Sequence, residues 1–168
     1  RNSSTTMNSE SEREHLEFME AAVEEARKGL NHLHGGPFGA VVVRDGQIIG
    51  RGHNMVLSTN DPTAHAEMLA IREASQRVNN FDLSDCVIYT SCEPCPMCFA
   101  AVHWAKMRRM YYGCTREDAA KIGFDDEYIY KVFEGTAQEK QVETVQVHRD
   151  ACLSPFSEWE KLEDKIQY

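Results

Sequence analysis

Two short stretches carry side chains that could together hold a metal ion and move a proton beside it. His65 and Glu67 lie in the sequence Thr-Ala-His-Ala-Glu, and Cys95 and Cys98 lie in the later sequence Cys-Glu-Pro-Cys-Pro-Met-Cys. One imidazole and two thiolates are ligands that zinc prefers, and a catalytic zinc keeps its fourth position for water. Because Glu67 is only two residues from His65, it lies off the helical face of that ligand. We predict that Glu67 transfers protons and that the other three side chains bind zinc.

Helix starts are expected at both stretches. Pro94 predicts that Cys95 and Cys98 lie in the first turn of a helix, on one face of it. A helix N-terminus favours the thiolate, which is the form of cysteine that binds metal. The residues at 61–63, Asp-Pro-Thr, predict a second helix start that places His65 near its N-terminal end.

A closed structural zinc site is the alternative to a catalytic one. It would need a fourth protein ligand, and Cys92 is the nearby candidate because the cysteines have C-x-x-C-x-x-C spacing. Cys92 precedes Pro94, so we expect it on the extended segment that leads into the helix. A zinc-bearing module without enzymatic activity is a further alternative, and the presence of Glu67 argues against it.

Composition and charge limit the class of protein. The 168 residues are typical of one domain, which we predict to span 12–168, after a disordered extension at 1–11. The formal net charge of −9 argues against nucleic acid as the main partner. The apolar runs are too short to span a bilayer and no secretory segment is evident, so we expect a cytoplasmic protein with no membrane partner.

The hydrophobic pattern alternates between helices and strands after an initial helix and an antiparallel hairpin. This order predicts an α/β fold in which helices cover both faces of a five-stranded mixed sheet, as three α/β/α layers. The expected strands are at about 38–43, 47–52, 86–91, 110–113 and 142–148, and the expected helices are at about 12–30, 62–78, 95–106, 116–121 and from 154 onward.

The chain resembles the cytidine-deaminase-fold enzymes, and within them the guanine deaminases of bacterial type. The resemblance covers nearly all of 12–168, although 131–152 matches only in pattern. It implies a cytidine-deaminase-like fold, one zinc ion per subunit and a hydrolase of purine metabolism that converts guanine to xanthine and ammonia. The supporting residues are Gly-Gly-Pro-Phe-Gly-Ala at 35–40, Asn54, the two zinc-ligand stretches at 59–67 and 91–98, Gly-Phe-Asp-Asp at 123–126, Leu-Ser-Pro-Phe at 153–156 and Tyr168.

The resemblance also assigns roles around the substrate. Phe38 would pack on the purine ring, and Asn54 and the backbone of Ala66 would bond its edge. Asp126 would accept hydrogen bonds from guanine N–H groups, and Tyr168 would close the site. Without the resemblance, Phe38 is equally well explained as core, Asn54 as a turn residue and Asp126 as a solvated loop charge.

The resemblance further implies a homodimer in which the C-terminal segment, about 131–168, is exchanged between subunits. Tyr168 would then serve the site of the neighbouring subunit. Two activities of the same fold stay open as alternatives, namely a guanosine deaminase and a tRNA adenosine deaminase that acts on a flipped-out base.

Overall fold

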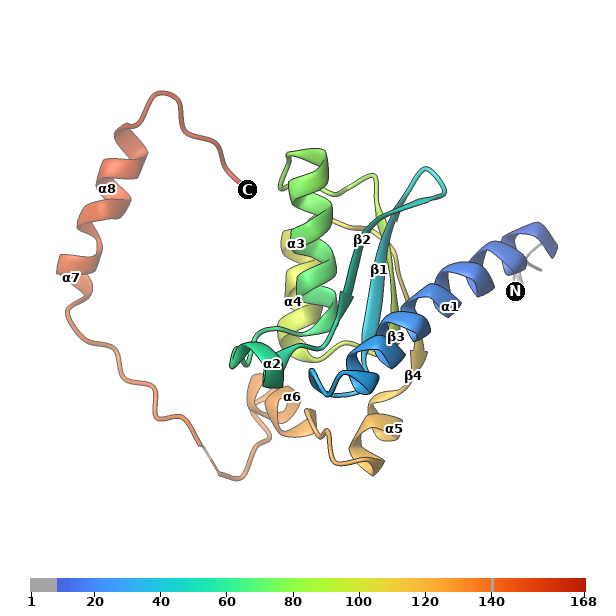
Figure 1. Cartoon of the computed structure of the whole chain (residues 1–168). Coiled ribbons are helices and arrows are strands. Elements are labelled where there is room, and N and C mark those ends of the chain that lie inside the picture. The colour runs from blue at the N-terminus through green and yellow to red at the C-terminus, as the bar shows by residue number, and fades with distance from the viewer. Residues whose placement is uncertain (1–8, 140) are drawn as a thin grey trace, which may run out of the picture. The chain divides into compact units, whose positions relative to one another are not determined.

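The computed structural model describes residues 9–139 and 141–168 (Figure 1). The chain forms two compact units, of which the first ends at Glu127 and the second is Tyr128–Tyr168. Helix α1 begins at Ser9, so that residues 9–11 are helical rather than part of a disordered extension. Residues 1–8 of the predicted extension lie outside the described residues.

The first unit contains a four-stranded mixed sheet with the order β2-β1-β3-β4. Strand β1 pairs antiparallel with β2 and β3, whereas β3 and β4 are parallel. The predicted hairpin turn is confirmed at Asp45 and Gly46, whose φ angles of 49° and 72° suit the tight turn of a two-residue hairpin. The strands are β1 Gly39–Arg44, β2 Gln47–His53, β3 Val87–Cys92 and β4 Met110–Cys114.

Alternate side chains of β1 enter two different cores. Val41 and Val43 pack with Phe18 of helix α1, Ser9–Asn31, on one face of the sheet. Ala40 and Val42 join the core on the other face, which helices α3, Ala66–Val78, and α4, Pro96–Trp104, cover (Figure 1). The predicted arrangement of helices on both faces of a mixed sheet is therefore confirmed for the first unit.

Helix α3 lies very close to strand β2. A Cβ atom added at Gly52 would lie 2.2 Å from the carbonyl oxygen of Ala66, and one at Gly50 would lie 2.3 Å from that of Ala70. Only glycine permits this approach of a helix backbone to a strand. The contact fixes the N-terminal end of α3 against the sheet.

The predicted fifth strand, at 142–148, is wrong. Among the described residues the sheet has four strands, and this segment is irregular. Val142, Val145 and Val147 are 77%, 66% and 67% exposed, so the apolar side chains that suggested a buried strand enter no core formed by the described residues. An apolar pattern predicts that a segment is buried, but it does not predict whether the same chain or another chain buries it.

The remaining helices are short. The predicted helix at 116–121 is confirmed as α5, Arg116–Lys121, with a capping box formed by Thr115 and Asp118. The helix expected from residue 154 is confirmed as α8, Ser154–Lys161. The sequence interpretation did not include α2 Val56–Thr59, α6 Glu127–Glu134 or α7 Arg149–Cys152.

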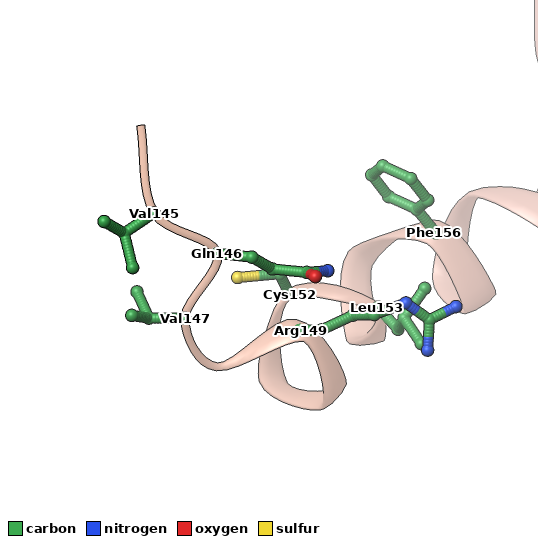
Figure 2. A pocket seen from close by; sticks show the side chains of 7 residues that line it. All are labelled: Val145, Gln146, Val147, Arg149, Cys152, Leu153 and Phe156. Atoms are coloured by element: carbon green, nitrogen blue, oxygen red, sulfur yellow. The ribbon is translucent and has the colours of Figure 1, made fainter. Parts of the chain in front are cut away.

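The second unit has no buried side chain among its described residues. Large apolar side chains such as Phe133, Phe156 and Ile166 are 78%, 69% and 67% exposed. Figure 2 shows an open hollow in this unit that contains none of the predicted site residues. Its lining residues are Val145, Gln146, Val147, Arg149, Cys152, Leu153 and Phe156. No helix among the described residues is long and apolar enough to cross a membrane.

Candidate metal centre

The three predicted zinc ligands lie at the starts of two helices. His65 is the N-cap of α3, and Cys95 is the N-cap of α4, with Cys98 in the first turn. The helices begin at Ala66 and Pro96, slightly later than expected from the positions of the two earlier prolines. Both caps have the extended backbone that is typical of N-cap residues, with ψ of 154° at His65 and 168° at Cys95, but neither side chain makes a capping hydrogen bond to its helix.

A turn before α3 explains why this helix begins late. One carboxylate oxygen of Asp61 accepts hydrogen bonds from the backbone N–H and the hydroxyl of Thr63, at 2.8 and 2.7 Å. Asp61 therefore caps a separate turn, and the helix starts only after His65. Sequence correctly indicated a capping residue here but not which turn it caps.

The distances among the ligand atoms fit a tetrahedral zinc ion. Nδ1 of His65 lies 3.5 Å from Sγ of Cys95 and 3.5 Å from Sγ of Cys98, and the three atoms all lie within 4.8 Å of one another. Zn–N bonds of about 2.0 Å and Zn–S bonds of about 2.3 Å at tetrahedral angles require an N···S separation of about 3.5 Å. The side chains are thus already arranged as zinc requires.

Hydrogen bonding polarises the two thiols. The Cys98 thiol donates to the Cys95 sulfur, which lowers the pKa of Cys95 despite its burial. The same hydrogen bond, together with burial, raises the pKa of Cys98. The hydrogen bond to Cys95 also raises the pKa of His65. Zinc binding would displace the proton held on Cys98, because a cysteine binds zinc as its thiolate.

Cys92 lies outside the ligand cluster. Its buried thiol faces the carbonyl oxygen of Thr115 at 3.6 Å, and burial raises its pKa to about 12. Among the described residues, only His65, Cys95 and Cys98 form a cluster that could hold a metal ion. Three protein ligands leave a fourth position for water, so the arrangement fits a catalytic zinc site better than a closed structural one.

Glu67 lies in the first turn of α3 and is only 6% exposed. One of its carboxylate oxygens accepts a hydrogen bond from the hydroxyl of Thr90 at 2.9 Å. Burial raises the pKa of the Glu67 carboxyl. A carboxyl group whose pKa is raised toward neutrality is suited both to take up and to give up a proton.

Sequence analysis missed Thr90, which is 1% exposed on β3. Its hydroxyl lies within 2.9 Å of both the Glu67 carboxylate and the Cys92 carbonyl oxygen. The hydroxyl has a single hydrogen, so it can donate to one of these acceptors at a time. The available signal was a polar side chain at a strand position whose neighbour on the same face, Ile88, belongs to the core.

We expect Thr90→Val to lower kcat about 10- to 100-fold with little change in KM, because a hydrogen bond to a charged group contributes about 1.5–3 kcal/mol. Steady-state kinetics and zinc content measure this effect. Ser91→Ala is the matched control, since Ser91 lies beside Thr90 on β3 and its hydroxyl accepts a hydrogen bond from the backbone N–H of Gly39 on β1 rather than donating one to Glu67. Equal losses of kcat in both variants would contradict a specific role for Thr90.

Three of the predicted substrate-binding residues, Phe38, Asn54 and Ala66, lie in the first unit. The backbone N–H of Asn54 donates to the carbonyl oxygen of Phe38 at 3.1 Å, which places the two residues side by side. The Asn54 side chain is 7% exposed, and its Oδ1 accepts a hydrogen bond from the N–H of Val56 at 3.1 Å. Its Nδ2 group is therefore the donor left for another partner. Ala66 is fully buried beside His65.

Asp126 interacts electrostatically with the ligand cluster. Burial raises the pKa of Asp126, and the negative charge of Cys95 raises it further. The preceding Phe124 meets Phe38 edge to face, with ring centroids 5.0 Å apart. Tyr168 belongs to the second unit, so its role at the site stays a prediction.

Comparison with known proteins identifies the family. The cytidine and deoxycytidylate deaminase zinc-binding region matches residues 12–114. The chain belongs to this family. A guanine deaminase of Bacillus subtilis is 47% identical over 154 residues, which are 92% of this chain and 99% of that protein. A tRNA-specific adenosine deaminase of Streptococcus pyogenes is 38% identical over 79% of this chain and 78% of that protein.

The fold agrees with the family assignment. The X-ray structure of guanine deaminase from Bacillus subtilis superposes with a TM-score of 0.86 at 46% identity, covering 96% of this chain and 99% of that one. The predicted resemblance to bacterial guanine deaminases is therefore confirmed.

Proposed function

We propose that this chain is a zinc-dependent aminohydrolase that converts guanine and water to xanthine and ammonia. The observation that carries the proposal is the spacing of His65, Cys95 and Cys98 for zinc beside the buried Glu67 carboxylate. This arrangement occurs in a chain that is 47% identical to a guanine deaminase over 99% of that protein.

His65, Cys95 and Cys98 would hold one zinc ion in each chain. When bound, zinc supplies the acidity that makes a water molecule nucleophilic at neutral pH. Glu67 accepts a proton from the attacking water and passes it to the ring nitrogen next to C2 of guanine. It then takes the remaining proton from the hydroxyl on C2 and gives it to the amine, so that the C2–N bond breaks, ammonia leaves and the oxygen stays on C2 as a carbonyl. Thr90 orients the carboxylate during both transfers.

Three side chains of the first unit account for recognition of the purine. Phe38 offers an aromatic wall for the flat ring, with Phe124 supporting it edge-on. The Nδ2 group of Asn54 donates to an acceptor on the purine edge. The Asp126 carboxylate accepts from the N1–H and 2-amino groups, which are the donors that distinguish guanine from adenine.

A homodimer with exchanged C-terminal segments is part of the proposal. The described residues of Tyr128–Tyr168 have no buried side chain, and their apolar residues are exposed. Many exposed apolar side chains in one segment are typical of a segment that another chain covers. The exchange would take Tyr168 to the site of the partner.

Mixing two defective variants tests the exchange. One variant carries Glu67→Gln with an intact C-terminus, and the other keeps Glu67 but lacks Tyr168. In a dimer that contains one chain of each variant, exchange would bring Tyr168 of the Glu67→Gln chain to the site that still has Glu67. We expect the unfolded and co-refolded equimolar mixture to recover about a quarter of wild-type activity, because half of the dimers would have one complete site. Activity no higher than the average of the two parents would contradict the exchange.

Ammonia release from the zinc-loaded protein tests the function, with guanine, guanosine, adenine, cytosine and cytidine measured in parallel. We expect turnover of guanine, with the other four substrates far slower. Turnover of guanosine but not guanine would overturn the substrate and leave the zinc chemistry in place. The tRNA-specific relative makes RNA the second candidate, and turnover of tRNA that falls steeply with salt would favour it.

A further inference from the structure

A row of hydrogen-bonded side chains lies next to Asn54, outside the metal centre. Oε2 of Glu25 lies 3.2 Å from Nδ1 of His53, and Nε2 of His53 lies 2.9 Å from Nδ1 of His34. The side chains of Glu25 and His53 are only 7% and 13% exposed. We call these three residues the Glu25 row, and the proposed mechanism assigns them no role.

An ionised Glu25 and a neutral His53 would give the row one direction of hydrogen bonding. The other oxygen of Glu25 accepts a hydrogen bond from Nζ of Lys28 at 3.2 Å. An ionised carboxylate only accepts hydrogen bonds, so Nδ1 of His53 is the donor to Glu25. In neutral His53 the other nitrogen, Nε2, must then be an acceptor, and Nδ1 of His34 donates to it. Helix α1 thereby orients both imidazole rings.

The row joins the two segments that carry the purine-contacting side chains. His53 is followed directly by Asn54, and His34 opens the loop that leads to Phe38. The bond between His34 and His53 thus connects the two segments through side chains, next to the backbone bond from Asn54 to Phe38. The carbonyl oxygen of His34 also accepts from the N–H groups of Leu57 and Ser58, at 3.0 and 3.1 Å. These bonds hold helix α2 beside the same corner.

Close packing leaves this corner little freedom. A Cβ atom at Gly29 would lie 2.8 Å from the ring of His53, and one at Gly35 would lie 2.0 Å from Oδ1 of Asn54. The first contact fixes the ring of the central histidine against α1. The second means that the loop after His34 touches the amide that would bind the purine. A shift of His34 would therefore move that amide.

We propose that Glu25, His53 and His34 are positioning residues for purine binding, which set the KM for guanine by holding Asn54 and Phe38 in register. The inference rests on the proposed function and adds the residues that determine affinity at its site. The side-chain hydrogen bonds of the row join its members to one another and to Lys28 rather than to the metal ligands or Glu67, so its loss is expected to affect binding far more than the chemical step.

Two substitutions at His34 separate a hydrogen bond from mere packing. Asparagine can place its amide N–H where Nδ1 of histidine lies, whereas leucine has a similar size and no donor. We expect His34→Leu to raise the guanine KM about tenfold with kcat nearly unchanged, and His34→Asn to stay within about twofold of wild type. Zinc content is expected to stay at the wild-type level in both.

The matched control is His15, which lies on helix α1 and whose Nδ1 is hydrogen-bonded to the hydroxyl of Tyr89. His15→Leu removes a comparable histidine bond away from Asn54, so we expect a lower Tm with an unchanged KM. The inference is overturned if His34→Leu keeps the wild-type KM, if His34→Asn raises KM equally, or if His15→Leu raises KM as much. A wild-type protein that does not turn over guanine would instead overturn the proposed function, and the role of the row with it.

Discussion

Glu67→Gln is expected to lower kcat about 10²- to 10⁴-fold, which is the usual contribution of general acid–base catalysis. Glutamine has nearly the same shape and can still accept the hydrogen bond from Thr90 through its amide oxygen. It cannot carry the proton from water to the ring nitrogen. The side chain is buried beside the ligand cluster but is not part of it, so zinc binding should survive.

The decisive comparison is between turnover and metal content in the same preparation. Zinc measured by atomic absorption should stay near one ion per chain, and guanine should still bind. Ammonia release from guanine should fall to the level that the wild-type protein shows with the slowest of the five tested substrates. A zinc-loaded Glu67→Gln protein with near-normal kcat would remove Glu67 from the mechanism. Loss of zinc in this variant would mean that the carboxylate is a ligand instead.

His65→Ala and Cys95→Ala are expected to lose zinc and activity together. Each substitution leaves two protein ligands in place of three, and among the described residues the cluster holds no fourth side chain that could bind the metal instead. We expect less than about a tenth of the wild-type zinc after dialysis, with ammonia release reduced in proportion. Metal analysis and kinetics on the same samples test this expectation.

Cys92→Ser provides the control for these two variants. It also removes a thiol close to the centre, but this thiol faces the carbonyl oxygen of Thr115 and not the ligand cluster. We expect wild-type zinc content and no more than a modest loss of Tm. If Cys92→Ser lost zinc as His65→Ala does, the centre would be a closed site with four protein ligands, and the catalytic interpretation would fail.

The local chemistry of the metal centre could be predicted from sequence because it depends on residue types and short spacings. His65, Cys95 and Cys98 meet at the expected distances for zinc, even though their helices begin slightly later than expected. Thr90 could not be predicted in the same way. Its contact with Glu67 joins a strand to a helix, and only the packing of α3 on the sheet brings the two side chains together.

The difference between local patterns and long-range packing also explains where the predicted fold was wrong. The first four strands have apolar residues that pack within this chain, so their pattern and their structure agree. The valines at 142–147 have an equally suggestive pattern but are exposed. The Glu25 row could not be predicted from the sequence either. Glu25 is 28 residues from His53, and His34 is 19 residues from it, so only the fold brings the three side chains together.

The close approach of α3 to the edge strand β2 has a consequence for how the enzyme can vary. Because Gly52 touches the backbone of Ala66, any larger side chain there would push on the residue between His65 and Glu67. Gly52 contacts neither the metal nor the purine in the proposed site, but it therefore determines where the side chains of His65 and Glu67 lie. In a saturation-mutagenesis map of fitness, we expect Gly52 to be as intolerant of substitution as the metal ligands.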